Sequence, residues 1–166
     1  LGMPLKHSLS PVMHNAALKE MNLNWCYLGL PCEKDALKKI LEGLRELNCH
    51  GLNVTIPHKN RITKLCNELS PLARRLGAVN TLRPNQDNGW SGDNTDVLGF
   101  LAPLKSTNYE WVNRNGMVLG CGGSARAVIT GLRELGISKI TVVGRNRERL
   151  NSFIKDMYQT LLDYPK

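Results

Sequence analysis

The chain lacks the features by which nucleic-acid-binding proteins are usually recognised in sequence. Aromatic residues make up only 5% of its 166 residues, and basic residues come singly or in pairs such as Lys38-Lys39 and Arg74-Arg75. Nucleic-acid surfaces typically cluster Lys and Arg on one face. The formal net charge of +8, from 22 basic and 14 acidic residues, therefore favours anionic small molecules as ligands, and we expect no nucleic-acid partner.

Signatures of membrane, metal and hydrolase proteins are missing as well. No stretch reaches the roughly 18 apolar residues of a membrane span, and G-x-S-x-G does not occur. The cysteines are odd in number and never spaced C-x-x-C, which argues against a zinc cluster and a disulfide framework. They are Cys26, Cys32, Cys49, Cys66 and Cys121. We expect reduced thiols in a cytoplasmic protein without a metal.

Apolar residues alternate between extended and helical spacing, which predicts an α/β fold. The elements expected in the first half are an extended segment at 25–30, a helix at 37–47, strands at 51–56 and 79–83, a turn at 85–89, a return strand from Trp90 and a helix at 97–104. Because strands alternate with helices along the chain, we expect parallel sheets in both halves, and a mainly parallel sheet in this one.

The segment 105–115 is polar and aperiodic, so we place a domain boundary there, between 1–104 and 105–166. Beyond it we expect a strand at 117–119, a helix at 125–135, a strand at 139–143 and one further helical segment. This order corresponds to the first part of a Rossmann dinucleotide-binding domain.

A glycine-rich turn joins the strand at 117–119 to the helix that follows. Its sequence, Gly120-Cys121-Gly122-Gly123-Ser124-Ala125, fits G-x-G-x-x-G/A. Gly120 would permit the tight turn, Gly122 would let the backbone approach a pyrophosphate, and Ala125 would allow close packing of helix on strand. The free N–H groups at the helix start would then face phosphate. The alternative is a glycine-rich turn that binds no ligand.

The residues after the strand at 139–143 bear on the choice of dinucleotide. An acidic residue at this point would bind the ribose 2′-hydroxyl of NAD, whereas arginine would bind the 2′-phosphate of NADP. The sequence here is Gly144-Arg145-Asn146-Arg147-Glu148-Arg149. It favours NADP, because three arginines are present and no acid directly follows the strand. A solvated helix start, with Glu148 paired to neighbouring arginines, is the alternative.

Polar residues gather beside the apolar segments of the first half. Asn53 and Thr55 lie on the same side of a strand, and Lys59 follows shortly afterwards. Asn80-Thr81 and Asn94-Thr95-Asp96 provide further amides, hydroxyls and a carboxylate. This chemistry suits a polyhydroxylated acid better than an apolar ligand.

Polar residues of the first half also have purely structural interpretations. Ser10, which precedes Pro11, is a good helix N-cap, and Asp96 could equally cap the helix after it. Lys59 taken alone would be an ordinary surface lysine. The four histidines show no ligand spacing.

Taken in order, five motifs resemble the shikimate dehydrogenase family. They are His7-Ser8-Leu9-Ser10-Pro11, Asn53-Val54-Thr55-Ile56-Pro57-His58-Lys59, Gly77-Ala78-Val79-Asn80-Thr81, Asn94-Thr95-Asp96 and the glycine-rich turn running on to Ala127. The match spans nearly the whole chain, and the Val143–Asn146 stretch is similar to the cyanobacterial branch. The resemblance implies a substrate-binding domain at 1–104, a partial NADP-binding Rossmann domain at 105–166, and a family that continues beyond Lys166.

The resemblance also implies the activity and the site. The family reduces 3-dehydroshikimate to shikimate reversibly with NADPH, in aromatic amino-acid biosynthesis. The positions implied are Lys59 and Asp96 as the catalytic pair; Ser8 and Ser10 for the substrate carboxylate; Asn53, Thr55, Asn80 and Asp96 for the ring hydroxyls; Gly120, Gly122, Gly123, Ser124 and Ala125 for the dinucleotide; and Arg145, Asn146 and Arg149 for the 2′-phosphate.

The chemistry of these residues agrees with the implied reaction. Hydride transfer to a ketone leaves a developing alkoxide that needs a proton and a nearby cation, and Lys59 can supply both. One departure is Gly144, which stands where many members of the family have asparagine. A quinate/shikimate dehydrogenase that accepts NAD, and a non-catalytic paralogue that only binds nucleotide or shikimate, remain as alternatives. We expect a monomer or homodimer.

Overall fold

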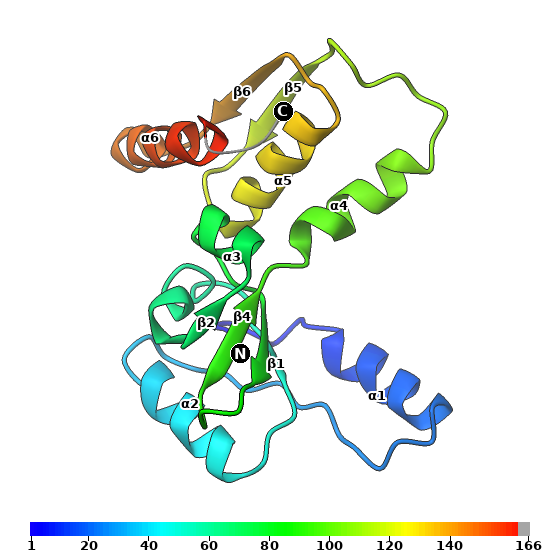
Figure 1. The fold of residues 1–166 in the computed structure, drawn as a ribbon, viewed down its shortest axis with the longest axis vertical. Helices are drawn as coiled ribbons and strands as arrows, with labels where there is room; N and C mark the ends of the chain where they lie inside the picture. Colours follow the sequence, from blue (N-terminus) through cyan, green and yellow to red (C-terminus); the bar gives the residue numbers. More distant parts are fainter. Residues whose placement is uncertain (163–166) are drawn as a thin grey trace.

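The computed structural model describes residues 1–162, which form two α/β units joined by one helix (Figure 1). The elements in chain order are α1 (Ser10–Glu20), α2 (Leu37–Glu46), β1 (Leu52–Asn53), the 3-10 helix η1 (Ile62–Leu65), β2 (Glu68–Leu69), α3 (Pro71–Leu76), β3 (Thr81–Pro84), β4 (Trp90–Asp93), α4 (Asp96–Lys105), β5 (Asn115–Leu119), α5 (Gly123–Glu134), β6 (Lys139–Val143) and α6 (Arg147–Leu162). The predicted α/β class is confirmed.

The sheet of the first unit is mixed, so the prediction of a mainly parallel sheet is wrong. Its strand order is β1-β3-β4-β2; β3 pairs antiparallel with both β1 and β4, and only β2 pairs parallel, with β4. The cause is the turn between β3 and β4. There the backbone N–H of Asn85 donates to the Gly89 carbonyl over 3.1 Å, and the Asn85 side chain accepts from the Gly89 N–H over 2.7 Å. Strands joined by so short a turn have to run antiparallel.

Of the two other strands expected in this unit, one does not form and the other is shorter than predicted. Within the described residues, the segment 25–30 is not a strand, because the side chain of Asn15 bonds both the N–H and the carbonyl of Tyr27, at 2.7 and 2.9 Å. The strand expected at 51–56 is reduced to Leu52–Asn53. The chain turns soon afterwards, since the Thr55 carbonyl accepts from the N–H of His58.

The second unit follows the predicted strand–helix–strand order. β5 and β6 are parallel and in register from Asn115–Lys139 to Leu119–Val143, and α5 connects them. All four elements of the unit contribute to its core, which consists of the buried Val118, Ala125, Ile129, Phe153 and Met157, with the partly buried Ile140 and Val142 of β6 packed against them. The described part is therefore a β-α-β-α arrangement, as expected for the first part of a Rossmann domain.

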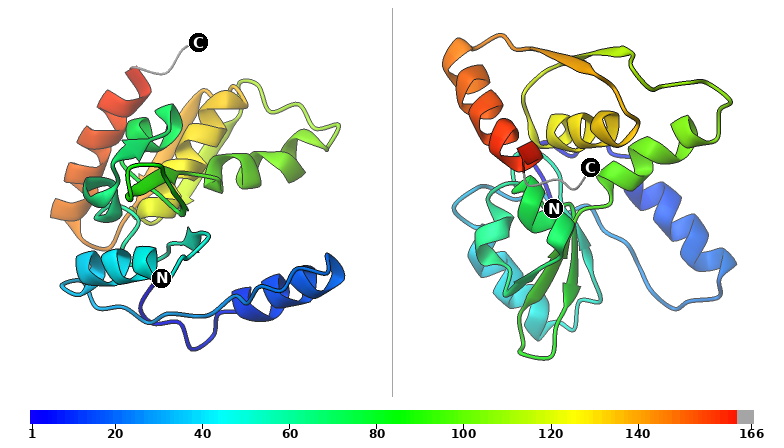
Figure 2. Two further views of the ribbon diagram at one scale, coloured as in Figure 1. Left: turned by 60° about the horizontal axis from the view of Figure 1, so that its bottom comes forward. Right: turned by 45° about the horizontal axis from the view of Figure 1, so that its top comes forward.

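α4 connects the two units and packs against α5 (Figure 2). Val97 and Leu101 of α4 share one core cluster with Leu76 and Ala78 of the first unit and Ala127 of α5. The polar segment after α4 therefore separates two stretches of sequence whose side chains are packed together. This packing brings the start of α5 close to the sheet of the first unit.

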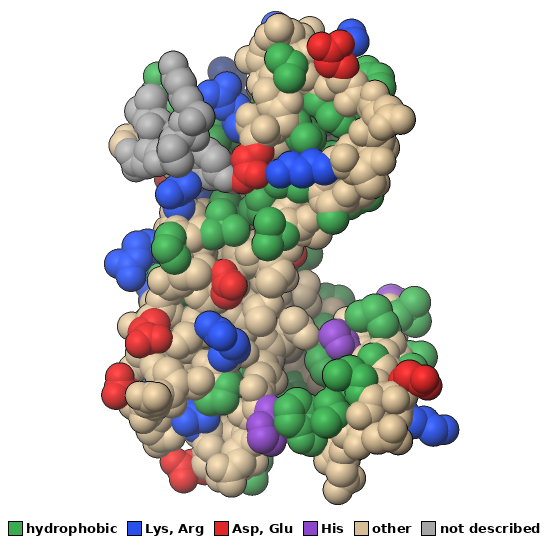
Figure 3. Space-filling model, turned by 45° about the vertical axis from the view of Figure 1, so that its right-hand side comes forward, with side chains coloured by type: hydrophobic (Ala, Val, Ile, Leu, Met, Phe, Trp, Pro, Cys, Tyr) green, Lys and Arg blue, Asp and Glu red, His purple; other side chains and the backbone are tan. Residues whose placement is uncertain are grey.

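α1 belongs to neither core. None of its residues is buried, and Val12 and Met13 are 71% and 60% exposed. Figure 3 shows hydrophobic side chains gathered on this protruding lobe, at the lower right. Contacts with Tyr27 hold the helix, through the two Asn15 bonds and through His14, whose ring stacks on that of Tyr27 at 4.4 Å.

Among the described residues, the structure shows no membrane-spanning helix and no metal-binding group of side chains. No helix within residues 1–162 is long and apolar enough to cross a membrane. Over the same residues, no three His, Cys, Asp or Glu side chains are grouped so that they could hold a metal ion.

Candidate active site

Lys59, in the turn after β1, and Asp96, at the start of α4, form an ion pair. The Lys59 Nζ donates to the Asp96 Oδ2 over 2.6 Å, although the residues are 37 positions apart in sequence. The side chains are only 11% and 25% exposed, so solvent screens the pair weakly. Asp96 is the first residue of α4 and does not cap it; Thr95 occupies the N-cap position. Neither structural alternative for Lys59 and Asp96 applies.

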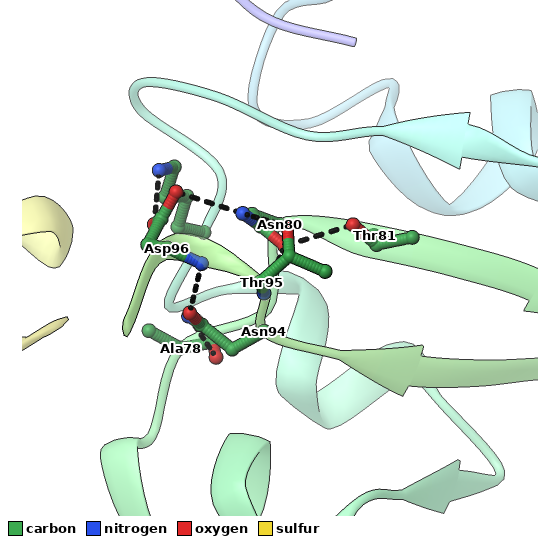
Figure 4. A network of polar contacts seen from close by, with 7 residues as sticks. Ala78, Asn80, Thr81, Asn94, Thr95 and Asp96 are labelled. Atoms are coloured by element: carbon green, nitrogen blue, oxygen red, sulfur yellow. Dashed lines mark hydrogen bonds and ion pairs between the residues drawn. The ribbon is translucent and has the colours of Figure 1, made fainter. Parts of the chain in front are cut away.

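A network of amides and hydroxyls fixes the second oxygen of Asp96 (Figure 4). The buried Asn80 donates from Nδ2 to the Asp96 Oδ1 over 2.7 Å and to the Thr95 Oγ1 over 3.0 Å. Its own oxygen accepts from the Thr95 N–H and the Thr81 hydroxyl. Asn94 accepts from the Asp96 N–H over 3.0 Å. The carboxylate therefore has little freedom to rotate away from Lys59.

The backbone around Lys59 is held just as firmly. Its carbonyl accepts from the Val79 N–H over 2.8 Å, and the Asn60 side chain donates to the Gly77 carbonyl over 2.8 Å. The ring of His58, fully buried beside it, bonds through Nε2 to the Cys32 carbonyl over 2.8 Å. These bonds connect the turn that carries Lys59 to the segment 77–79 on one side and to Cys32 on the other.

A second polar group contains Ser10 and Asn53, which are joined by Tyr27, a residue that no sequence motif indicates. Tyr27 donates its hydroxyl to the Asn53 Oδ1 over 2.9 Å. Burial raises the pKa of Tyr27, and a hydrogen bond with Ser10 partly opposes this shift. Tyr27 lies in the short apolar run at 25–30, and its single hydroxyl is the only feature of that run that could indicate a polar site.

The other residues expected at this end are less tightly bonded. Ser10 is the first residue of α1 and its side chain caps nothing, which leaves the hydroxyl for other contacts. Ser8 is exposed and its Oγ accepts from the Ser10 N–H at 3.4 Å. Thr55 is half-buried, and among the described residues no hydrogen bond joins its side chain to Lys59 or Asp96.

The glycine-rich turn has the geometry that a dinucleotide fingerprint requires. Gly120 has φ +113°, a value open to glycine and strained for other residues, and its N–H donates to the Val143 carbonyl over 2.7 Å. Gly122 is the N-cap residue of α5 without a side-chain cap, and a Cβ there would meet open space. Ala125 is buried against β5, whereas Ser124 is exposed.

A cavity of about 800 Å³ lies between this turn and the end of β6. It is lined by Leu119, Gly120, Cys121, Gly122, Val143, Gly144, Arg145, Asn146 and Arg149. Both arginines are exposed, and among the described residues neither guanidinium forms an ion pair with Glu148. Asn146 caps α6, since its Oδ1 accepts from the Arg149 N–H over 2.8 Å. Free N–H groups and two arginines in one cavity fit an anionic dinucleotide.

Gly144, the departure noted in the sequence, has a packing reason. A Cβ at this position would lie 3.3 Å from the Leu150 Cδ1 and 3.5 Å from the Cys121 Sγ. The glycine therefore lets the start of α6 and the glycine-rich turn approach each other below the cavity.

Comparison with known proteins gives a consistent result. Residues 1–82 match the family described as shikimate dehydrogenase substrate binding domain. The chain is 47% identical over 154 residues to a shikimate dehydrogenase (NADP(+)) of Prochlorococcus marinus (strain MIT 9515), covering 93% of this chain and 53% of that protein. The chain thus spans about half the length of the curated relatives it matches.

Solved structures show the same similarity. The shikimate dehydrogenase of Aquifex aeolicus has a TM-score of 0.85 at 39% identity, covering 93% of this chain and 57% of that one. The shikimate 5-dehydrogenase of Thermus thermophilus, solved in complex with NADP(H) and shikimate, has a TM-score of 0.81 at 35% identity, covering 95% and 59%. Both halves of the described fold, and their connection through α4, lie within these matches.

Proposed function

Because residues 1–82 match the shikimate dehydrogenase substrate-binding domain family, we propose that the protein is an NADP-dependent shikimate dehydrogenase that interconverts 3-dehydroshikimate and shikimate. One observation carries the proposal: Lys59 and Asp96, from separate motifs, form a partly buried ion pair at 2.6 Å, and Asn80 donates a hydrogen bond to the same carboxylate. The step belongs to aromatic amino-acid biosynthesis.

The catalytic pair has the chemistry that the reaction needs. Reduction of a ketone builds negative charge on its oxygen, which a fixed ammonium group stabilises and then protonates. We assign this role to Lys59. Asp96 keeps the ammonium in place through Oδ2, while Asn80 prevents the carboxylate from turning through its bond to Oδ1. In the reverse direction the same lysine takes the proton from the substrate hydroxyl.

The remaining polar residues are assigned to substrate recognition. We assign the carboxylate to Ser8 and Ser10, with Tyr27 beside them, because its hydroxyl connects this end to Asn53. Asn53, Thr55, Asn80 and Asp96 are assigned to the ring hydroxyls. Their amides, hydroxyls and carboxylate can both donate and accept, as a polyhydroxylated acid requires.

The cavity beside the glycine-rich turn is assigned to NADP. Gly120, Gly122, Gly123, Ser124 and Ala125 would form the turn and the helix start that receive the pyrophosphate, and Arg145, Asn146 and Arg149 would bind the adenosine 2′-phosphate. The nicotinamide, when bound, supplies the hydride. The guanidinium groups of the two arginines hold the phosphate by charge-assisted hydrogen bonds.

We assign residues 1–104 to the substrate-binding domain and 105–166 to a partial NADP-binding domain. The polar, aperiodic segment after α4 supports this boundary in the sequence, and the packing of α4 on α5 keeps the two domains in contact across it. Five free cysteines agree with a cytoplasmic location. We expect a monomer or homodimer with no nucleic-acid or membrane partner.

The proposal is tested with the natural protein that carries this chain, by following NADPH formation at about 340 nm with shikimate as substrate. Turnover with shikimate and NADP⁺ is expected, and a complete lack of turnover, with shikimate binding retained, would instead identify a non-catalytic paralogue. Comparable rates with quinate, or with NAD⁺, would identify the quinate/shikimate type.

A further inference from the structure

Gly123 has a close neighbour that the dinucleotide fingerprint does not explain. The fingerprint requires small residues at Gly120, Gly122 and Ala125, and it leaves position 123 open. In the structure, a Cβ on Gly123 would lie 3.3 Å from both the Cβ and the Cδ of Lys59, and 3.6 Å from the Asn60 Oδ1. By contrast, a Cβ on Gly120 or Gly122 would have no neighbour within 4 Å.

The contact joins the first residue of α5 to the side chain of the catalytic lysine. In Figure 4 a yellow ribbon lies at the left edge, on the Asp96 side of the polar network. The backbone of Lys59 is fixed by Val79 and its ammonium by Asp96, over 2.8 and 2.6 Å. Between these two points the four-carbon stem is flexible by nature. The start of α5 lies so near this stem that even one added carbon atom on Gly123 would come closer to it than ordinary packing distance.

We infer that Gly123 is a positioning residue for Lys59: its missing side chain allows the start of α5 to lie against the lysine stem and so aims the ammonium at Asp96 and the substrate oxygen. The turn that would hold the dinucleotide and the lysine that would move the proton are then in direct contact. A shift of either one displaces the other. The inference rests on the proposed function for its catalytic consequence, but not for the contact itself.

A methyl group at this position would require a definite displacement. Carbon atoms pack best at about 3.5–4.0 Å, so contacts at 3.3 Å push the lysine stem aside by a few tenths of an ångström. Proton transfer needs donor and acceptor within about 2.6–3.2 Å, and a misplacement of about 1 Å can cost about 100-fold in rate. We therefore expect Gly123→Ala to lower kcat by about 5- to 50-fold.

The first experiment measures Gly123→Ala in the natural protein, with Gly43→Ala as its matched control. Gly43 lies in α2, and a Cβ there would meet nothing within 4 Å. For Gly123→Ala we expect a lower kcat at saturating NADPH, and because the backbone N–H at 123 is kept, the Kd of NADPH, from its fluorescence on titration, should change much less than kcat. Gly43→Ala should keep the parent kcat. An unchanged kcat, or a loss of activity explained wholly by a weaker Kd for NADPH, would overturn the inference.

The second experiment needs no activity and so separates this inference from the proposed function. Thermal unfolding is measured for Gly123→Ala, Lys59→Ala and the double variant; Lys59→Ala removes the Cδ half of the contact. Gly123→Ala should be better tolerated, by about 2–4 °C in Tm, when the stem is already absent. Gly122→Ala, which has open space, should be additive with Lys59→Ala. Additivity for Gly123 as well would refute the contact, whereas an inactive parent protein would refute only the proposed function.

Discussion

The two ends of the proposed active site are built in opposite ways. At the catalytic end, Lys59, Asp96 and Asn80 are at least partly buried and bonded to one another. At the phosphate end, Arg145 and Arg149 are exposed, and their guanidinium groups form no ion pair within residues 1–162. The catalytic end is hydrogen-bonded within the protein without a ligand. The phosphate end presents positive charge that an anionic ligand would neutralise.

This difference predicts how each end responds to mutation. A buried polar network leaves its members unsatisfied when one is removed, so a change there costs both stability and activity. Exposed arginines lose no protein partner when truncated, so a change there costs ligand binding alone. Variants at the two ends should therefore separate catalysis, folding and affinity.

The largest effect is expected at Lys59. Lys59→Ala removes the proton donor and leaves Asp96 as an unpaired, mostly buried carboxylate, so kcat should fall by about 10²–10⁴-fold. Steady-state rates with shikimate and NADP⁺ measure it. Lys59→Arg keeps the charge but cannot give up its proton, so it should restore stability and not rate. Undiminished activity of Lys59→Ala would show that the catalytic assignment is wrong.

Asn80→Ala should affect both folding and catalysis. It removes the donor to Asp96 and the acceptor for Thr95 and Thr81, at a site only 9% exposed. A loss of about 1–3 kcal/mol in the free energy of unfolding is expected, together with a lower kcat/KM. Urea unfolding and kinetics measure the two effects. Ser106→Ala, which removes an exposed hydroxyl at the end of α4, is the control and should stay within about 0.5 kcal/mol.

Replacing Arg145 and Arg149 together by Ala should weaken NADP⁺ binding by about 10- to 100-fold, because each charge-assisted bond contributes about 1.5–3 kcal/mol before screening by solvent. The affinity for NAD⁺, which lacks the 2′-phosphate, and the Tm should hardly change. Titration with both cofactors tests this. Arg147→Ala is the control for charge alone. Equal losses for NADP⁺ and NAD⁺ would contradict the assignment.

The catalytic end could be predicted from motifs, but its geometry could not. Local sequence places Lys59 after a strand and Asp96 at a helix start, whereas their contact depends on how the turn, β3 and α4 are brought together. Tyr27 was missed because one hydroxyl in an apolar run looks like a core residue. The role of Asn146 as the cap of α6 follows from local hydrogen bonding that its position at a strand end did not reveal.

The error in the first sheet has a different origin. The turn at 85–89 was identified in the sequence, and two strands joined by it must be antiparallel. The mainly parallel sheet was predicted from the alternation of strands and helices along the chain, but β3 and β4 follow each other without a helix between them. In the second unit the same alternation holds, and the parallel pair of β5 and β6 was predicted correctly.

The smallest effect is expected for two cysteines, Cys66 and Cys121, whose thiols differ in burial. Burial raises the pKa of Cys66 to about 11, so this thiol is neutral and unreactive at pH 8, whereas Cys121 lines the open cavity. Because the folded protein favours the neutral thiol, its contribution to stability is full below pH 9.0 and is lost as the pH rises through about 11. The free energy of unfolding of the parent, relative to that of Cys66→Ala, should therefore be constant below pH 9 and should fall as the pH rises from 9 through about 11.

Labelling of the thiols at pH 8 makes the same comparison directly. An alkylating reagent should modify Cys121 well before Cys66, and NADP⁺ should slow the reaction at Cys121 several-fold, since the proposed ligand would cover that cavity. Cys26, which is exposed and outside the cavity, serves as the unprotected control. Peptide mapping by mass spectrometry follows each site. Equal protection of Cys26 and Cys121 would mean that NADP⁺ stabilises the whole fold. It would contradict the assignment of NADP⁺ to the cavity lined by Cys121.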